Sequence, residues 1–472
     1  MTAPSAEVDL VVVGAGVAGL VIAHDAARAG LRVTVLEAAA AAGGLLRRAV
    51  LDGIPIDVGA ESFATRTSGV ADLIVDAGLD LRIVDPAPFG AHLAVAGASD
   101  NAASIIRAPL PQATVLGIPA DPLADDVVRI LGADGARRAR AEIAVPADPE
   151  PSLADLVTAA CGPLLTERLV DPLCRSVYSV PAADARLSRL HPALWREFRA
   201  RGSLIEAAGA AAAPHRPGSG VAGISGGMWR LADALLAVAL AQGVRVVTGV
   251  AARAITPDAG GVRVALDDAV LHARRVVVAT GSAAARALLA TPGIPVKSAP
   301  AVRVVAALID SPALDAYPVG SGVIVAAGVP SAAKALTHSS AKWPWLAELL
   351  DSRRAAGSPH IVRLSARDAD APGLDTEADV AREVALLTGA PITEAAVRAV
   401  TSALWTDAVA AAPVDPDRRD ELSRAGIDLA GAATAGTGLA SVVPHARALA
   451  RDVVARLAAT PVLDGQSLWR NP

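Results

Sequence analysis

The glycine-rich segment near the N-terminus, "DLVVVGAGVAGLVIAHDAARAGLRVTVLEA" at residues 9–38, constrains the fold more than any other stretch. The apolar run at 10–13 predicts a buried strand, and residues 18–29 predict a helix that ends before a glycine. A second apolar run at 32–36 predicts another strand. Strand, glycine loop, helix and strand in this order are typical of a Rossmann-type βαβ unit, and so indicate an α/β fold.

Three glycines in this loop stand in GxGxxG register. Gly14 permits the tight turn, Gly16 lets the backbone approach a pyrophosphate, and Gly19 lets the helix pack closely on the strand. The helix N-terminus then offers free N–H groups to phosphates. Glu37, at the end of the second strand, would accept the ribose hydroxyls and repel a 2′-phosphate. A glycine-rich packing turn would not need Glu37, so we predict a dinucleotide site.

The sequence after this unit favours FAD over NAD. The glycine pair at 43–44 is followed by "DGIPIDVGAESF", an alternating strand pair with a second glycine turn at 59–62. The run "ARRVVVATGS" at 273–282 predicts a return strand. No second GxGxxG follows a strand, because "GISGGMWRLADALL" at 223–236 reads as a turn into an amphipathic helix with no strand before it. Without a nicotinamide site, a bound flavin would pass its electrons to oxygen or another acceptor.

Composition excludes several classes of protein. The net charge of −5 offers no footprint for nucleic acid, and the eight scattered histidines indicate no metal site. Cys161 and Cys174 predict free buried thiols rather than a disulfide. The mean hydropathy is +0.44, but the apolar stretches at 10–23 and 234–241 are too short to span a membrane. The first residues are acidic, so we expect a cytoplasmic protein, with peripheral membrane attachment left open.

The order of patterns along the rest of the chain predicts three bodies. We expect helices at 152–213, 378–387 and 393–400, a linker at 207–220, and strands within 244–279, 302–329 and 361–366. This implies a Rossmann-like FAD-binding domain built from discontinuous segments, with a mixed-sheet substrate domain and a helical domain inserted. The predicted boundaries are 1–85, 221–290 and 400–472 for the FAD domain, 86–110 and 291–399 for the sheet domain, and 111–220 for the helical domain.

Motifs along nearly the whole chain resemble one known family. They are "GAGVAGL…LEA…GG…DVGAESF", "PLPQATVLGIPADP", "ERLVDPLCRSVYSVPAADARLS", "GISGGMWRLADAL", "SSAKWPWL" and "GTGLASVVPHA". Their order is similar to that of the bacterial FAD-dependent protoporphyrinogen/coproporphyrinogen oxidases, within the amine-oxidase-like superfamily. The resemblance implies oxidation of a porphyrinogen to a porphyrin, with three oxygens reduced to peroxide. The alanine-rich, soluble character looks more like the actinobacterial coproporphyrinogen III branch than the membrane-bound protoporphyrinogen branch.

The resemblance also implies which residues contact FAD. They are Gly14, Ala15, Gly16, Val17, Ala18 and Gly19 for the pyrophosphate, Glu37, Ala38 and Val250 for the adenosine, and Gly44, Leu45, Gly59, Ala60, Glu61, Ser62, Trp405, Thr437, Gly438 and Leu439 for the flavin half. The chain departs from the family at "LWTDAVAAAPV" (404–414), where Arg-Trp and a Met-Pro-Gln-Tyr-like tetrad are usual. It departs again at 176–178, Ser-Val-Tyr instead of Gly-Val-Tyr, and at 436–438, Gly-Thr-Gly instead of Gly-Val-Gly.

The chemistry expected of this family needs few protein groups. The flavin accepts the hydride, so no obligatory acid or base residue is expected. The substrate's four propionates need cations, for which Arg66, Arg175 and Lys342 are the candidates, with a solvated surface role as the alternative. Trp343 and Trp345 could flank the macrocycle or pack in the core.

Several alternatives stay open from sequence. The chain could be a protoporphyrinogen IX oxidase, a related oxidase of amines or carotenoid precursors, or a flavin-binding scaffold without turnover. With two tyrosines, an aromatic cage for an amine is hard to build. The expected partners are a tetrapyrrole, O2 and a ferrochelatase that receives the product, and the chain could be a monomer or a homodimer.

The C-terminal segment "LAGAATAGTGLASVVPHARALARDVV" (429–454) is predicted to complete the same site. We expect a strand at 428–432, a turn at 436–438 and a helix from about Ser441, with Pro444 in its first turn, where a missing N–H costs little. The N-terminus of that helix would face the flavin's pyrimidine carbonyl and stabilise negative charge there.

Overall fold

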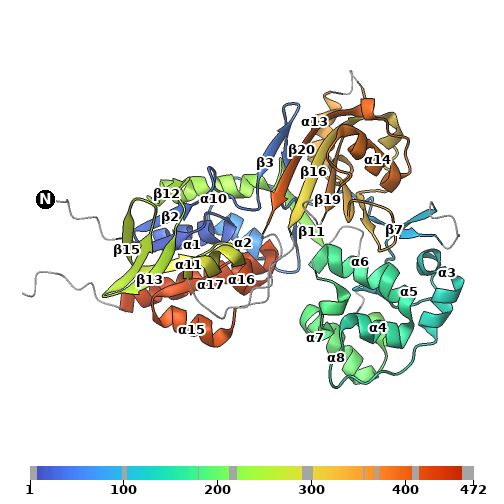
Figure 1. Cartoon of the computed structure of the whole chain (residues 1–472), viewed down its shortest axis with the longest axis horizontal. Helices are drawn as coiled ribbons and strands as arrows, with labels where there is room; N and C mark the ends of the chain where they lie inside the picture. Colours follow the sequence, from blue (N-terminus) through green and yellow to red (C-terminus); the bar gives the residue numbers. More distant parts are fainter. Residues whose placement is uncertain are drawn as a thin grey trace, which may run out of the picture.

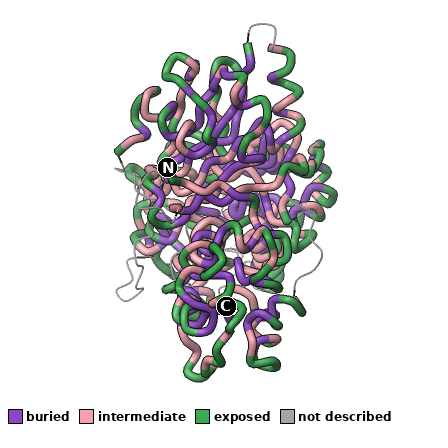
Figure 2. The backbone as a smooth tube through the Cα atoms, turned by 90° about the vertical axis from the view of Figure 1, so that its right-hand side faces the viewer, coloured by how far each residue is buried: buried purple, intermediate pink, exposed green. Residues whose placement is uncertain are grey.

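The computed structural model describes residues 8–97, 104–178, 180–211, 220–289, 301–353, 357–366, 372–406 and 414–459. The molecule is elongated, with one α/β body at one end and a second sheet and a helical body at the other (Figure 1). Buried segments lie mostly in the interior of the molecule, and exposed segments lie mostly at its periphery (Figure 2).

The first sheet is the predicted Rossmann-like layer. Its order is β12 (Arg245–Thr248), β2 (Val33–Glu37), β1 (Val8–Val13), β15 (Val270–Val278), β14 (Gly261–Ala265) and β13 (Ala254–Asp258), with β21 (Ile427–Leu429) beside β15. β1 runs parallel to both β2 and β15, which confirms the βαβ unit and the predicted return strand. The parallel partner β21 comes from the far end of the chain, so distant segments build this sheet.

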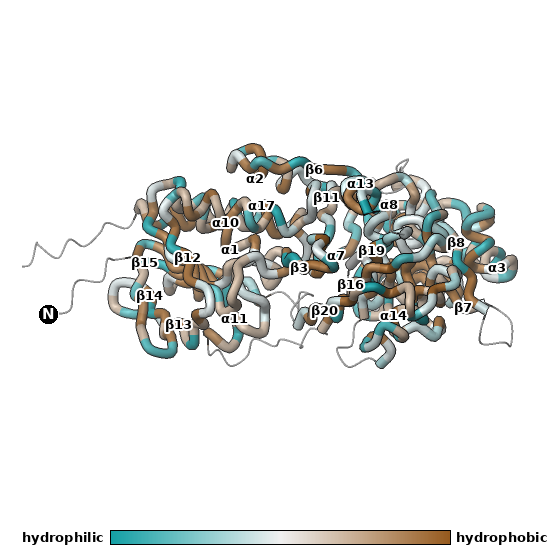
Figure 3. The backbone as a smooth tube through the Cα atoms, turned by 90° about the horizontal axis from the view of Figure 1, so that it is seen from above, coloured by the Kyte–Doolittle hydropathy of each residue, from teal (hydrophilic) through white to brown (hydrophobic). Residues whose placement is uncertain are grey.

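Both faces of this sheet are covered, which explains why residues 10–13 of β1 are all apolar. Leu10 and Val12 pack toward a core shared by α1 (Val17–Arg28), α10 (Trp229–Ala241), α17 (Leu439–Ala459) and α2 (Gly69–Asp76). Val11 and Val13 face the opposite way, toward β13, β14, α11 (Ser282–Leu289) and α15 (Pro416–Arg424). Figure 3 shows the hydrophobic strand segments between these two layers.

The second sheet has seven strands. Their order is β20 (Val397–Trp405), β16 (Val302–Asp310), β19 (Pro359–Ala366), β18 (Ala335–His338), β17 (Gly322–Val325), β7 (His92–Ala96) and β8 (Ile105–Pro109). One face packs against α14 (Glu377–Thr388), the helix predicted at 378–387. The other face packs against α13 (Pro344–Asp351) and the hairpin of β3 (Arg48–Leu51) and β4 (Ile54–Asp57).

The helix predicted at 393–400 was wrong. Only a short 3-10 turn, Glu394–Ala396, precedes β20, which pairs antiparallel with β16 along its length. The apolar residues of 397–405 fit both a helical and an alternating pattern, and pairing with β16 decides between them. The domain boundary expected at residue 400 therefore falls inside a strand of the second sheet.

The helical body contains α3 (Asp125–Arg140), α4 (Leu153–Cys161), α5 (Pro163–Leu165), α6 (Asp171–Leu173), α7 (Leu187–Leu190), α8 (Pro192–Arg201) and α9 (Leu204–Ala211). The linker expected at 207–220 was wrong at its start, because Ala207 and Ala208 are buried in α9. Residues 212–219 lie outside the described residues. Cys161 and Cys174 are free and buried, as predicted, and burial raises the pKa of each thiol to about 12.

Neither a membrane-spanning helix nor a metal-binding cluster is found in the described ranges. Among the helices there, none has both the length and the apolar composition that crossing a bilayer requires. Within the same residues, no cluster of three or more His, Cys, Asp or Glu side chains is arranged to hold a metal ion.

Candidate functional site

The N-terminal glycine loop has the close contacts that its sequence predicts. Gly14 has φ +106°, and a Cβ there would lie 2.9 Å from the carbonyl oxygen of Ala279. A Cβ on Gly19 would lie 1.9 Å from the Gly14 carbonyl oxygen, so only glycine lets α1 pack this closely. Gly16 is the N-cap of α1 and provides no side-chain cap. The first N–H groups of α1 therefore remain available to an anion, as a pyrophosphate would require.

Glu37 lies at the centre of the part of the site predicted to hold adenosine. Its carboxylate accepts hydrogen bonds from the backbone N–H groups of Ala15 (2.8 Å) and Ala39 (2.9 Å). Its carbonyl accepts one from the N–H of Val250 (3.0 Å). These bonds hold Glu37 beside the glycine loop and bring Val250, which is distant in sequence, to the same place. A carboxylate has about four lone-pair positions, so acceptor capacity remains for ribose hydroxyls.

Backbone contacts through residues 43–45 connect the N-terminal glycine loop to the second glycine turn at 59–62. The N–H of Gly43 donates to the Ala15 carbonyl at 2.8 Å, and a Cβ on Gly44 would lie 3.1 Å from the Gly16 Cα. The Leu45 carbonyl then accepts a hydrogen bond from the N–H of Ala60 at 3.0 Å. The residues predicted to contact the pyrophosphate are therefore neighbours of those predicted to contact the flavin.

Trp405 lies beside the second glycine turn at 59–62. Its indole Nε1–H donates to the Val58 carbonyl at 2.9 Å, and the side chain is buried. A Cβ on Gly59 would lie 1.8 Å from the Leu45 carbonyl oxygen and 3.3 Å from the Trp405 ring. The structure therefore places Trp405 directly against the second glycine turn. Most of the departing segment after it, residues 407–413, lies outside the described residues.

Glu61 forms a buried ion cluster at the same turn. Its carboxylate pairs with the Lys342 Nζ at 2.7 Å and the Arg363 Nη1 at 2.5 Å, and accepts a hydrogen bond from the Ser339 Oγ at 3.1 Å. Arg363 also donates to the Gly59 carbonyl at 2.6 Å. Burial alone would raise the pKa of Glu61, but the two cations outweigh it and lower the pKa to about 2. Arg363 was missed from sequence, although a lone arginine in the apolar strand "HIVRLSA" was a usable signal.

Asp57 caps the helix that follows "GISGG". Its carboxylate accepts the backbone N–H groups of Met228 (2.8 Å) and Trp229 (2.9 Å) at the start of α10, while burial raises its pKa to about 6. The interpretation of this segment as a turn into a helix is confirmed. The absence of a preceding strand was wrong, because β11 (Val221–Ile224) pairs with β5 (Phe63–Ala64) and β6 (Ile83–Val84). Four residues are too few to show an alternation in sequence.

The start of α17 also differs from the expectation. The helix begins at Leu439 rather than near Ser441, and a short helix, α16 (Ala432–Ala435), separates it from β21. Thr437, Gly438 and Leu439 form the entry to α17, where a Cβ on Gly438 would meet no atom within 4 Å. This open backbone at a helix N-terminus suits a polar ligand.

Pro444 lies in the second turn of α17, so its missing N–H would leave the Ala440 carbonyl without its helical donor. The Thr67 hydroxyl replaces that donor at 3.0 Å. A Cβ on Gly69 would lie 2.5 Å from the Pro444 ring, so these segments are in close contact. The stretch before α2 therefore holds the first turns of α17.

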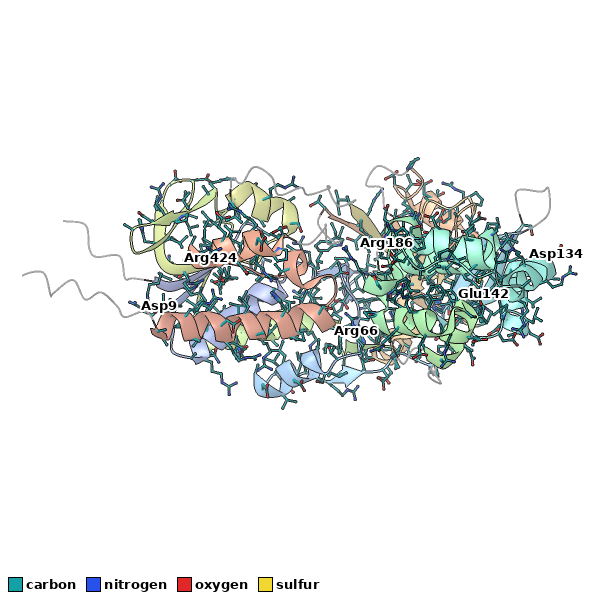
Figure 4. The ribbon with its side chains drawn as sticks, turned by 90° about the horizontal axis from the view of Figure 1, so that it is seen from below. Asp9, Arg66, Asp134, Glu142, Arg186 and Arg424 are labelled. Carbon is teal, nitrogen blue, oxygen red and sulfur yellow. The ribbon has the colours of Figure 1, made fainter. Side chains whose placement is uncertain are left out.

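The three cations proposed for substrate all have partners. The Arg66 Nη2 donates to the Ser441 Oγ at 2.7 Å, at the end of α17 that points toward the rest of the molecule (Figure 4). Arg175 pairs with Asp171 within the helical body, and Lys342 pairs with Glu61. Their roles toward a substrate remain predictions. Trp343 is buried against the second sheet, which supports core packing.

Together these residues suit a dinucleotide. The predicted adenosine end offers a carboxylate, the middle offers close-packed glycine backbone and the N-terminus of α1, and the predicted flavin end offers a tryptophan and the N-terminus of α17. The glycines allow these segments to approach closely, because a Cβ at these positions would push the neighbouring backbone away. We call the resulting arrangement of the two glycine turns and the two helix N-termini the cradle.

Comparison with known proteins supports this interpretation. Residues 17–458 match the family described as flavin containing amine oxidoreductase. The chain is 30% identical over 347 residues to the coproporphyrinogen III oxidase of Mycobacterium tuberculosis, covering 70% of this chain and 73% of the relative. It is 29% identical over 376 residues to the coproporphyrinogen III oxidase of Mycobacterium leprae, covering 75% and 76%.

A solved structure supports the fold. The crystal structure named "Putative protoporphyrinogen oxidase" from Exiguobacterium sp. 255-15 superposes with a TM-score of 0.76 at 23% identity, covering 96% of this chain and 99% of that chain. At that identity the likeness concerns the fold alone. The family match and the mycobacterial relatives confirm the recognition and enzyme class expected from the motifs: the chain belongs to the flavin-containing amine oxidoreductases and is a flavin-dependent oxidoreductase.

Proposed function

We propose that this protein is an FAD-dependent oxidase that converts coproporphyrinogen III to coproporphyrin III. Three O2 would accept the six electrons and leave as three H2O2. The observation that carries the proposal is the coincidence of a dinucleotide cradle with extended similarity to two mycobacterial enzymes named coproporphyrinogen III oxidase. The reaction would belong to haem biosynthesis.

FAD would lie along the line of residues described above. The N-terminal glycine loop, Glu37 and Val250 would hold the adenosine diphosphate end, and the turn at 59–62, Trp405 and the start of α17 would hold the flavin. The bound flavin supplies the oxidising chemistry. The protein's own groups would bind and orient the substrate and exclude water around it. Hydrogen bonds such as that from Ala15 to Glu37 pre-order the cradle before the cofactor arrives.

The remaining parts of the proposal follow from the same similarity. The second sheet and the helical body would form the substrate side, and the three-body division stays a proposal. We also propose a cytoplasmic location, transfer of the product to a ferrochelatase, and a monomer or homodimer.

The test uses the flavin-loaded protein with coproporphyrinogen III and protoporphyrinogen IX in separate reactions. Anaerobic coproporphyrinogen should bleach the flavin, and admission of oxygen should give porphyrin fluorescence with three O2 consumed per porphyrin. Comparable rates with both substrates would contradict the coproporphyrinogen preference. A flavin that neither substrate bleaches would instead support a scaffold without turnover.

A further inference from the structure

Arg47 is a charged side chain at the proposed flavin turn that the site described above does not use. We propose that its guanidinium binds a carboxylate of the substrate. This inference rests on the proposed function, because it assigns a contact to the propionate groups of the porphyrinogen. It adds a position that the sequence did not single out.

The guanidinium of Arg47 is held by an aromatic ring. Its Cζ lies 5.0 Å from the centroid of the Trp405 ring, within the range of a cation–π contact. Trp405 is itself fixed by its bond to the Val58 carbonyl, and the Arg47 carbonyl accepts the N–H of Val58 at 3.1 Å. Stacking uses the face of a guanidinium and leaves its edge N–H groups for a carboxylate. Arg47 is therefore pre-oriented although it is exposed.

Arg47 lies next to the residues that are proposed to contact the flavin half of FAD. A Cβ on Gly59 would lie against the same Trp405 ring and the neighbouring Leu45 carbonyl. Leu45, Gly59 and Trp405 are three of the residues proposed to line the flavin. A substrate group bound at Arg47 would thus lie beside the redox centre rather than at a distant surface.

The charges at this turn favour an anionic ligand. Lys342 and Arg363 share the carboxylate of Glu61, and the charge of Arg363 also acts on Asp57, so these groups compensate one another. Within the described part of the chain, Arg47 forms no ion pair with a carboxylate, and its contact is the Trp405 ring. Arg66, Arg175 and Lys342, by contrast, each have a polar partner. A tetracarboxylate substrate matches a guanidinium that has no carboxylate partner among the described residues.

The neighbouring residue provides a matched control. Arg48 is also exposed, and its Cζ lies 4.9 Å from the Trp229 ring. Among the described residues it too forms no ion pair with a carboxylate. The guanidinium of Arg48 lies over Trp229, whereas that of Arg47 lies over Trp405. The two arginines share charge, exposure and stacking, and differ in the ring that holds them, since only Trp405 belongs to the proposed flavin half.

The experiment compares Arg47→Met and Arg48→Met in the flavin-loaded protein. Binding of coproporphyrin III and of its uncharged tetramethyl ester is followed by porphyrin fluorescence, and the KM for coproporphyrinogen III is measured in parallel. Arg47→Met should raise the Kd for coproporphyrin III by about tenfold or more, the loss expected for a charge-assisted hydrogen bond. It should leave ester binding and flavin content unchanged, and Arg48→Met should behave as the wild type.

Three results would overturn the inference while leaving the proposed function intact. They are unchanged binding and KM in Arg47→Met, equal weakening in Arg48→Met, and equal weakening toward the ester. Wild-type protein that neither binds coproporphyrin nor oxidises coproporphyrinogen would overturn both proposals. Wild-type protein that binds coproporphyrin through Arg47 without oxidising coproporphyrinogen would overturn the proposed function alone.

Discussion

Replacement of Glu61 by glutamine tests the ion cluster at the proposed flavin turn. Glutamine keeps the shape of the side chain but removes the charge that compensates Lys342 and Arg363. The pKa of Glu61 is lowered from 4.5 to about 2 in the folded protein. A difference of that size corresponds to about 3 kcal/mol, since one pKa step is about 1.4 kcal/mol. Breaking a buried pair costs about 3–5 kcal/mol in general, so we expect Glu61→Gln to lose about 3 kcal/mol.

The assay is urea unfolding of the flavin-loaded protein at several pH values. Because the folded pKa of Glu61 is depressed, its contribution is present above about pH 4.5 and is lost as the pH falls toward 2. The difference between wild type and Glu61→Gln should therefore shrink over that interval.

The control is Asp267→Asn, which breaks the pair of Asp267 with Arg253. Both side chains of that pair are more than half exposed, so solvent screening predicts no measurable change. A loss below about 1 kcal/mol in Glu61→Gln at pH 7, within the range of ordinary substitutions, would refute the reasoning.

Three further predictions concern the same region. Thr67→Val removes the donor to the Ala440 carbonyl and should cost about 1 kcal/mol, and Pro444→Ala should cancel that loss by restoring the helical N–H; additive losses in a double-mutant cycle of urea unfolding would contradict this. Because burial raises the pKa of Asp57 to about 6, protonation of this group should stabilise the wild type as the pH falls from 7 toward 4. Melting temperatures should show that Asp57→Asn lacks this gain, and parallel curves would argue against it. Gly19→Ala should be purified without flavin absorbance, since its Cβ would lie 1.9 Å from a backbone oxygen; normal flavin content would disprove the close-packing argument.

Much of the body that contains the first sheet could be predicted, because its structure follows from short sequence patterns. The glycines at 14 and 19 require a close backbone approach, and an apolar strand such as β1 must be covered on both faces. The segment at 397–405 could not be assigned this way, because its apolar residues fit two periods and pairing with β16 selects the strand. The prediction that Pro444 lies in the first turn of the last helix was wrong for a related reason. The exact residue at which a helix begins depends on packing, and α17 begins at Leu439.

By itself the sequence determined the α/β class, the glycine loop, Glu37 as the acid at the end of the second strand, and the family, because these depend on short patterns and their order. Only the tertiary structure decided which charged groups neutralise one another. Glu61 meets Lys342 281 positions and Arg363 302 positions further along the chain, and Thr67 meets Ala440 after 373 positions. No local pattern encodes such encounters, because they arise when separately folded segments bury the same surface. The position of the Arg47 guanidinium over Trp405 is also decided only by that packing.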